Sequence, residues 1–406
     1  MISTLNLADH LTAIIGRQYV REHEGNLAVA PDNTQQISEI LRFANENHLT
    51  VTPTGGDTKQ SWGNPVHPNI YLSLTRLNRV LEHPWQDLTC TVQAGCTWQQ
   101  LQQTLARHGQ FVALDSLWPE RATVGGILAT NDSGAIRHRY GSLRDLVIGM
   151  TLVLADGTVA RSGGKVVKNV AGYDLCKLVT GSFGTLAVIT EATFRLHPLP
   201  QHAQSFTVSA PQAAQLAPLI ASIRSSHLLT EALQLRGGTS GFDLDIQLNA
   251  HPEARQSEIL AQMTQAANLK LSEALDDVWQ TRELLLSQRG KLLFKATMLP
   301  EDVPAFAQEV QEKGGECVAQ CLGLMFLVFP AGDNASVALA EEFRHHVGLQ
   351  LGTTMMIDRP DQGNDIESRA RTTIGELPNK FALMQAVKHQ FDPNRILNPG
   401  RFLEGI

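Results

Sequence analysis

Hydrophobic and polar positions follow two different rhythms along the chain, and the change falls near residue 200. In the first part, glycine and proline cut the sequence into short stretches. A helical period predicts a helix at 34–47, with Ile37, Ile40 and Leu41 on one face. Apolar runs predict short strands at 49–53, 70–74, 89–94, 146–154, 158–161 and 186–196.

Caps and turns mark where several of these elements begin or end. Thr97 and Gln100 have the spacing of a capping box, in which each side chain satisfies the backbone N–H of the other residue, so a helix is predicted to begin there. Asp156 and Gly157 stand between two apolar runs and predict a β-hairpin. A short helix is expected at 174–180.

After residue 200, longer amphipathic segments alternate with strands. The predicted order is strand 205–209, helix 212–225, strands 231–236 and 243–249, helix 253–268, an extra helix 275–287, strand 291–298, helix 302–313, strands 316–321 and 324–329, and helix 335–347. A βαββα unit therefore recurs weakly, which predicts an antiparallel sheet covered by helices. A last helix at 379–390 leads into a proline-rich and glycine-containing tail, 391–401, which should be rigid and extended.

Composition adds limits on class and on location. The chain has 406 residues, 43% hydrophobic and 18% charged, so we expect at least two globular domains rather than disorder. A net charge of -7 gives no reason to expect nucleic acid as a partner. No signal peptide is recognised, and apolar stretches such as 322–330 are too short for a membrane span. We expect a cytoplasmic protein, at most peripheral at the inner face of the membrane through partners.

Five cysteines are scattered without CxxC spacing, at Cys90, Cys96, Cys176, Cys317 and Cys321. This pattern argues against a disulfide framework, a zinc site or an iron–sulfur cluster in this chain. No metal site is predicted.

Two glycine-rich stretches could surround a phosphate group. The first follows a predicted strand and comprises Pro53, Thr54, Gly55, Gly56, Asp57 and Thr58. Paired glycines let backbone N–H groups approach a phosphate, although alone this loop is equally consistent with a tight turn. The second stretch, 121–134, continues to 145 and combines glycines with hydroxyl and amide side chains. Its alternative interpretation is a glycine-rich loop with only a structural role.

A third block, 163–190, brackets the short predicted helix with glycine turns before an apolar strand. This arrangement could place a planar ring against exposed backbone. Lys165 and Lys168 lie in its first turn, where they would contact an anionic cofactor or substrate, or else solvent.

In this order, the three blocks resemble the FAD-binding domain of the vanillyl-alcohol-oxidase-type flavoproteins. The run from Gly163 to Asp174 is similar in detail to the FAD-binding subunits of bacterial glycolate oxidases, and Asn398-Pro399-Gly400-Arg401 matches the closing motif of the family. The resemblance implies an α+β fold, with a two-part FAD-binding domain at 1–200 (subdomains 1–84 and 85–200). A cap domain with an antiparallel sheet covered by helices would follow at 201–376, and 377–406 would return to the FAD domain.

The resemblance also implies the cofactor and its contacts. FAD would be held by Pro53, Thr54, Gly55, Gly56, Asp57, Thr58, Pro119, Thr123, Gly125, Gly126, Ala129, Thr130, Asn131, Gly134, Arg139, Gly141, Gly184, Val188, Ile189 and Asn398. The 54–58 loop would bind the pyrophosphate, and Asn398 with Arg401 would return the tail to the flavin edge. Some members tether the flavin to a histidine in the first loop. Asp57 takes that place here, and Cys96 suits packing better than tethering, so non-covalent FAD is expected.

One departure from the family limits the assignment of catalytic residues. Catalytic 2-hydroxy-acid dehydrogenases of the family carry a C-terminal histidine motif, whereas this chain has only the adjacent His345 and His346 and the isolated His389 after residue 300. Adjacent histidines on a helix diverge and make a poor metal pair. No catalytic base can be named, so the catalytic residues are unknown.

Three functions therefore remain open. The first is the FAD-binding redox subunit of a glycolate or D-lactate oxidising complex, with a larger flavin subunit and an iron–sulfur subunit as partners and a small 2-hydroxy acid such as glycolate as substrate. The second is a self-sufficient FAD-dependent dehydrogenase of another small hydroxy acid, in which Arg236 or Arg359 would bind the carboxylate. The third is an assembly module without turnover.

Overall fold

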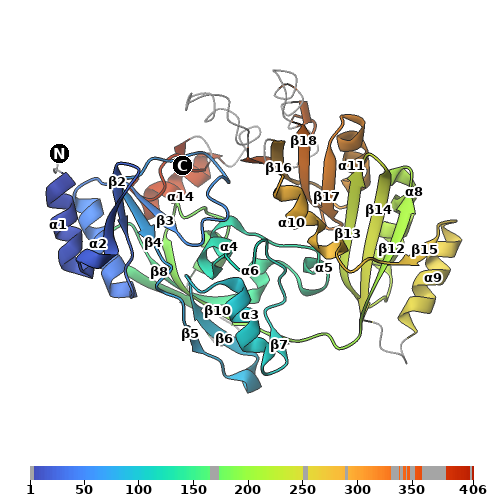
Figure 1. Cartoon of the computed structure of the whole chain (residues 1–406), viewed down its shortest axis with the longest axis horizontal. Coiled ribbons are helices and arrows are strands. Elements are labelled where there is room, and N and C mark those ends of the chain that lie inside the picture. Colours follow the sequence, from blue (N-terminus) through green and yellow to red (C-terminus); the bar gives the residue numbers. More distant parts are fainter. Residues whose placement is uncertain are drawn as a thin grey trace. The chain divides into compact units, whose positions relative to one another are not determined.

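The computed structural model describes residues 4–164, 173–249, 255–288, 291–330, 338, 342–343, 345–347, 353–358, 381–402 and 405–406. The chain divides into two compact units, and Figure 1 labels many of their elements. Unit 1 comprises Met1–Asp132, Ser142–Leu199 and Leu377–Ile406, and unit 2 comprises Ser133–Gly141 and Pro200–Glu376. The segment Ser133–Gly141, expected in the first domain, thus belongs to unit 2.

A small mixed sheet with two helices forms the first part of unit 1. Its strands are β1 (Val20–His23), β2 (Asn26–Val29), β3 (Val51–Thr54) and β4 (Ile70–Ser73), in the order β1-β2-β4-β3. Strand β4 runs parallel to β2 and β3. Helices α1 (Thr4–Ile15) and α2 (Thr34–Glu46) pack beside it, and α2 buries the predicted apolar face, so that helix prediction is confirmed. The Asn33 side chain caps α2 by accepting the Gln36 N–H.

The second part of unit 1 is an antiparallel sheet of β5 (Val80–Glu82), β6 (Thr89–Gln93), β10 (Val188–Arg195), β8 (Val147–Val153) and β9 (Val159–Gly163), in that order. The predicted hairpin at Asp156-Gly157 joins β8 to β9 and is confirmed. Helices α3 (Trp98–Ala106), α6 (Leu143–Leu146) and α7 (Leu175–Val179) accompany this sheet, and β7 (Gln110–Phe111) pairs with β11 (His197–Pro198).

Two local predictions differ from the structure. Helix α4 (Val124–Thr130) lies within the glycine-rich stretch 121–134, where no helix was predicted. At α3, the Thr97 hydroxyl accepts the Gln100 N–H (3.3 Å), but the Gln100 side chain donates to Asn78 O. The reciprocal half of the predicted capping box is therefore wrong, because a loop carbonyl competes for that amide.

The C-terminal segment is built into unit 1. Helix α14 (Phe381–Phe391) precedes a tail in which Val51 N–H donates to Ile396 O (2.7 Å) and Asn398 N–H donates to Val51 O (3.0 Å). The tail thereby extends the edge of β3. The buried ammonium of Lys388 donates to Asp392 (2.6 Å) and to backbone carbonyls, so the tail is anchored internally.

Unit 2 contains an antiparallel sheet made of two similar halves. Its strands are β12 (Ala203–Ala210), β13 (Thr230–Gly238), β14 (Gly241–Asn249), β15 (Leu271–Glu273), β16 (Lys291–Thr297), β17 (Glu316–Gln320), β18 (Leu324–Pro330) and β19 (Thr353–Asp358). Its helices are α5 (Arg137–Tyr140), α8 (Ala213–Ser225), α9 (Gln256–Ala266), α10 (Thr281–Leu286) and α11 (Val303–Glu312). The strand order is β15-β12-β14-β13-β17-β18-β16-β19.

This order reveals the repeat predicted from the sequence, extended by one strand. Within β12–β15 and again within β16–β19, the fourth strand lies beside the first, and the third lies between the first and the second. That is the split βαβ arrangement. The halves join where β13 pairs with β17, with Gln234 opposite Gln320. The predicted helix at 335–347 lies largely outside the described residues.

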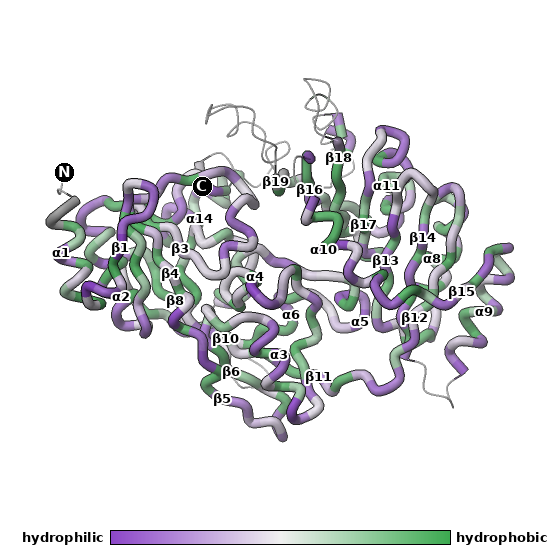
Figure 2. The backbone as a smooth tube through the Cα atoms, in the orientation of Figure 1, coloured by the Kyte–Doolittle hydropathy of each residue, from purple (hydrophilic) through white to green (hydrophobic). Residues whose placement is uncertain are grey.

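Each unit has its own hydrophobic core, visible as the green stretches that follow the strands in Figure 2. In unit 2, Leu233 and Leu235 face the helices α8 and α11, while Gln234 and Arg236 alternate onto the other face. No helix among the described residues is long and apolar enough to cross a membrane.

Candidate cofactor-binding site

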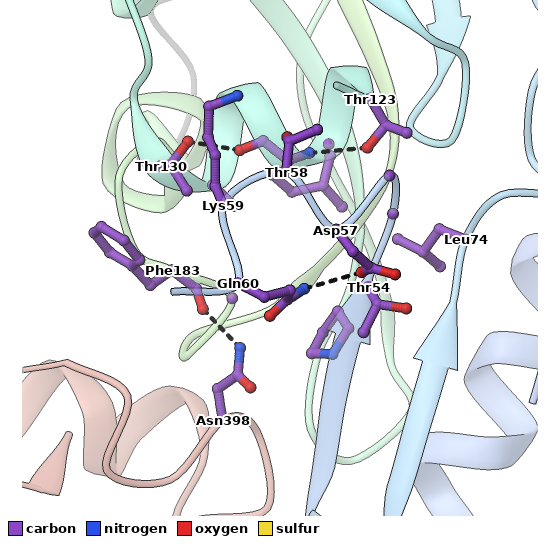
Figure 3. Close-up of a pocket in the computed structure, with 18 of the residues that line it drawn as sticks. Thr54, Asp57, Thr58, Lys59, Gln60, Leu74, Thr123, Thr130, Phe183 and Asn398 are labelled. Carbon is purple, nitrogen blue, oxygen red and sulfur yellow. Dashed lines mark hydrogen bonds between the residues drawn. The ribbon is translucent and has the colours of Figure 1, made fainter. Parts of the chain in front are cut away.

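A cavity in unit 1 lies where the predicted glycine-rich stretches and the tail meet (Figure 3). The cavity and the solvent-open space at its mouth together amount to about 710 Å³. It is lined by Pro53, Thr54, Gly55, Gly56, Asp57, Thr58, Lys59, Gln60, Leu74, Thr123, Gly125, Gly126, Ala129, Thr130, Phe183, Gly184, Ala187, Ile189, Asn398 and Arg401.

The loop that follows β3 forms one wall and offers backbone donors. No described residue accepts a hydrogen bond from the backbone N–H groups of residues 55–58. The glycines are required by close packing: a Cβ on Gly56 would lie 1.7 Å from Arg121 O, and one on Gly55 would lie 2.2 Å from Thr123 Oγ1. Successive N–H groups of this kind form a concavity suited to an anion.

Helix α4 forms a second wall, and its hydroxyls are used within the helix. Thr123 is the N-cap and accepts the Gly126 N–H (3.4 Å), while Thr130 Oγ1 donates to Gly126 O (2.8 Å). Gly125 lets α4 approach β6, because a Cβ there would lie 3.0 Å from that of Ala94. The small residues of this stretch therefore serve the packing of the wall as well as the width of the cavity.

The tail holds two other walls in place. Asn398 Nδ2 donates to Phe183 O (2.7 Å), beside Gly184, whose φ of +69° is accessible to glycine. Arg401 donates from Nε to Trp62 O (3.0 Å) and from Nη2 to the carbonyls of Lys59 (3.2 Å) and Gln60 (2.7 Å). In Figure 3, Asn398 points at Phe183 from the side opposite α4.

Sequence reasoning missed a buried ion pair beside this cavity. Lys59 lines it, and the Lys59 ammonium lies 3.2 Å from the carboxylate of Asp132, with Trp62 and Trp118 rings 5.9 and 5.6 Å away. Asp132 also accepts the Leu117 N–H (2.9 Å). Lys59 directly follows the glycine loop in the sequence, which is the signal that could have identified it.

Two groups of opposite charge meet at this loop, Asp57 on the loop itself and Arg401 from the tail. Burial raises the pKa of Asp57 above its usual 3.8, although a hydrogen bond from Gln60 and nearby cations act in the other direction. Burial lowers the pKa of Arg401 to about 10, so this guanidinium remains charged at neutral pH. Leu74, Ala187 and Ile189 add apolar surface of the kind that a planar ring can contact.

The structure brings together most, but not all, of the predicted cofactor residues. The cavity is lined by Pro53, Thr54, Gly55, Gly56, Asp57, Thr58, Thr123, Gly125, Gly126, Ala129, Thr130, Gly184, Ile189 and Asn398. Outside its lining are Pro119, Asn131, Gly134, Arg139, Gly141 and Val188. Val188 is buried in the core of unit 1, and Gly134, Arg139 and Gly141 belong to unit 2.

Candidate residues elsewhere have other roles or lie outside the described residues. Arg236 binds the buried Asp245 with two nitrogens (2.6 and 2.9 Å) and also pairs with Asp243, so its guanidinium is not available as the carboxylate clamp considered above. Lys165, Lys168 and Arg359 are outside the described residues. His346 pairs with Glu309 (2.7 Å), and the described part of the chain contains no cluster of three metal-binding side chains.

Comparison with known families identifies the cofactor. Residues 26–163 match the family model of the FAD binding domain, and residues 373–402 match that of the C-terminal domain of FAD linked oxidases. These segments contain the glycine loop, α4 and the closing tail that line the cavity. The matched segments are similar to FAD-linked oxidases, and the chain is an oxidoreductase whose cofactor is FAD.

Curated relatives include proteins similar over nearly the whole chain and proteins similar over less than half of it. A D-lactate dehydrogenase of Archaeoglobus fulgidus is 29% identical across 95% of this chain and 93% of its own length. The glycolate oxidase subunit GlcD of Bacillus subtilis is 38% identical, over 43% of this chain and 37% of its own. A bovine mitochondrial D-2-hydroxyglutarate dehydrogenase is 40% identical over 42% of this chain and 31% of its own.

Solved structures show the fold class. A p-cresol methylhydroxylase with bound substrate superposes with a TM-score of 0.76 at 16% identity, covering 98% of this chain and 96% of that one. An alkyldihydroxyacetonephosphate synthase gives 0.73 at 15% identity, covering 98% and 85%. The predicted α+β class, with an FAD-binding part of this type and an antiparallel sheet covered by helices, is confirmed.

Proposed function

We propose that FAD binds non-covalently in the cavity of unit 1 and serves the oxidation of a small 2-hydroxy acid. The observation that carries the proposal is the convergence of a loop of unused N–H donors, a buried arginine and apolar side chains in one cavity. This combination suits a cofactor with an anionic centre and planar ends. Asp57 stands at the loop, and a carboxylate cannot form the histidine-type tether to a flavin.

The residues of unit 1 would bind and orient the cofactor rather than exchange protons. Bound FAD supplies a two-electron acceptor for converting a 2-hydroxy acid to the 2-oxo acid. Residues 55–58 would donate backbone hydrogen bonds to the pyrophosphate, and Gly184 with Ile189 would leave room for a ring. Asn398 would keep the 183–184 backbone in place as the ring enters.

The names of the relatives support the proposed substrate class. Proteins named for D-lactate, glycolate and D-2-hydroxyglutarate match this chain, and these compounds share a hydroxyl next to a carboxylate. We favour a role as the FAD-binding subunit of a glycolate- or D-lactate-oxidising complex, with a larger flavin subunit and an iron–sulfur subunit as partners. The full-length match to a D-lactate dehydrogenase favours a second candidate, a self-sufficient dehydrogenase.

A pair of cations in unit 2 is the candidate for the substrate carboxylate, in place of Arg236. Arg282 on α10 and Lys295 on β16 both lie over the ring of Phe326, with the cations 5.4 and 6.0 Å from its centre. Arg282 is buried and donates to Ser133 O, which fixes its direction. Lys295 and Phe326 lie on the sheet face that carries Gln234 and Arg236, and a carboxylate bound there would accept hydrogen bonds from a guanidinium or an ammonium.

The test is a visible spectrum of the purified chain before and after anaerobic addition of substrate. We expect the flavin band at about 450 nm, release of all flavin into the supernatant on acid precipitation, and bleaching by glycolate or D-lactate. Bleaching by the isolated chain supports the self-sufficient dehydrogenase, whereas bleaching only with partner subunits supports the complex.

Substitution of the cation pair provides a second readout. Lys295→Met should weaken saturation by substrate at least about tenfold while leaving the flavin spectrum unchanged. Lys270, an exposed lysine of the same unit, offers the control Lys270→Met, which should have no effect. A colourless protein that takes up no added FAD contradicts the proposal as a whole.

A further inference from the structure

Arg401 is a buried cation whose hydrogen-bond partners are all neutral. Arg401 is only 5% exposed. Its Nε and Nη2 donate to the backbone carbonyls of Trp62, Lys59 and Gln60. Among the described residues, no carboxylate forms an ion pair with it and none accepts a hydrogen bond from Nη1. Burial of a charge without a counter-charge is costly, so a guanidinium in this setting is suited to binding an anionic ligand.

The surroundings hold the guanidinium in a fixed place. Asn64 Nδ2 donates to the carbonyls of Gly400 (2.9 Å) and Phe402 (3.0 Å), and Asn64 N–H donates to Arg401 O (2.9 Å). Gly63 is packed so closely that a Cβ there would lie 2.7 Å from Arg401 O. The backbone on both sides of the arginine is therefore fixed independently of its side chain, which is the condition for a preorganised charge.

The position of Arg401 along the cavity wall identifies the anion. Arg401 donates to the carbonyls of Lys59 and Gln60. These two residues directly follow residues 55–58, whose backbone N–H groups have no acceptor among the described residues. Charge and N–H donors therefore occupy adjacent parts of the same loop, and both line the cavity. Lys59 differs, because its ammonium already pairs with Asp132.

We infer that Arg401 supplies the counter-charge for the pyrophosphate of FAD, by donating from its guanidinium while the 55–58 backbone donates from the other side. This rests on the proposed occupation of the cavity by FAD. It assigns the last residue of the tail motif to the centre of the cofactor rather than to the flavin ring. Docking of the tail and binding of the cofactor then reinforce each other, because the anion satisfies the buried charge that the tail brings in.

Ligand fragments separate this inference from the alternatives. Affinities of apoprotein for FAD, ADP and riboflavin are measured by calorimetry for wild type, Arg401→Gln and Arg401→Lys. Arg401→Gln should weaken FAD and ADP alike, by about 10- to 100-fold, and leave riboflavin unchanged. Arg401→Lys keeps the charge without the planar donors and should recover part of this loss. Higher salt should weaken ADP binding less in Arg401→Gln than in wild type.

Controls keep the outcomes distinct. Arg107 is exposed beyond α3 and lines no part of the cavity, so Arg107→Gln should leave all three affinities unchanged. Thermal unfolding of each apoprotein checks the fold. If Arg401→Gln weakens binding of FAD but not of ADP, the inference is overturned in favour of a contact with the flavin. Equal weakening of all three ligands together with a lower melting temperature would also overturn it, in favour of a purely structural role. If wild type binds neither FAD nor ADP, the proposed site itself fails instead.

Discussion

Two arginines, Arg236 in unit 2 and Arg401 in unit 1, show how differently the two units use buried charge. Arg236 forms ion pairs with Asp245 and Asp243, so its charge is balanced within unit 2. Arg401 has only backbone carbonyls as partners among the described residues, and it lines a cavity. The difference indicates that Arg236 stabilises the sheet of unit 2, whereas Arg401 is placed to bind an anion in the unit 1 cavity.

The units also differ in what makes them fold. Unit 2 repeats a regular arrangement of strands whose side chains alternate between an apolar and a polar face. Its core is therefore built from the apolar positions of this regular pattern. The cavity of unit 1 is built from close backbone contacts at Gly55, Gly56 and Gly125, and from the distant tail.

Breaking the anchor of the tail should have the largest effect. Asp392→Ala leaves the buried Lys388 ammonium without its carboxylate, and Asp392 also accepts the N–H groups of Ile396 and Leu397. We expect unit 1 to lose about 3–5 kcal/mol of unfolding free energy. Chemical denaturation measures this, with Lys388→Met/Asp392→Leu as a milder comparison. Equal losses for the single and double variants would contradict the role assigned to the ion pair.

A side chain in the glycine loop should remove the cofactor. Gly56→Ala would place a Cβ 1.7 Å from Arg121 O, so the loop must shift and its N–H groups lose their alignment. We expect FAD affinity to fall at least about 100-fold, a cost of roughly 2.7 kcal/mol. Gly164→Ala serves as the control, since no described atom lies within 4 Å of its Cβ. Unchanged FAD binding in the Gly56 variant would remove this loop from the site.

Arg236→Gln should affect unit 2 alone. It leaves the buried Asp245 with neutral donors from Gln234 and Thr207, so we expect a loss of about 2 kcal/mol in unfolding free energy. FAD affinity should not change. Differential scanning calorimetry and FAD titration on the same preparation measure both quantities. A weaker FAD complex without any loss of stability would show that Arg236 serves the cofactor after all.

Replacing Asp57 should have a small effect on FAD affinity, opposite in sign to the effect of replacing Arg401. Because burial raises its carboxyl pKa above 3.8, the folded state holds this proton more tightly than the unfolded state. Its contribution to stability is therefore present at low pH and is lost as pH rises through the raised pKa. The ionised form repels an anionic cofactor, so FAD affinity should fall over the same window. Asp57→Asn should strengthen FAD binding about threefold and flatten this pH dependence; titrations from about pH 4 to about pH 8 test it, and an unchanged slope would contradict it.

The two units also differ in how well their elements could be predicted from the sequence. Helix α2 and the repeated strands of unit 2 were predicted because their apolar periods are long enough to stand out. Helix α4 was missed because glycine and small side chains, which its packing on Ala94 requires, hide a helical pattern. Edge strands β15 and β19 were missed because short edge segments have little apolar signal.

For the cavity, motifs predicted which loops come together but not how individual charges are satisfied. The 54–58 loop and Asn398 were expected at the site from resemblance, and they line one cavity. Gly134, Arg139 and Gly141 were expected there from the same resemblance, and they belong to unit 2. The pairing of Lys59 with Asp132 and the neutral partners of Arg401 depend on three-dimensional contacts that no local pattern encodes.

The most direct test of the account is titration of FAD into apoprotein, followed by flavin fluorescence, for the intact chain and for Gly56→Ala. If FAD binds non-covalently in the unit 1 cavity, we expect saturation at one FAD per chain for the intact protein, complete release of the flavin by acid, and loss of binding in the variant. Failure of the folded intact chain to take up FAD, or equal affinity in the two proteins, would contradict the assignment of this cavity to the cofactor.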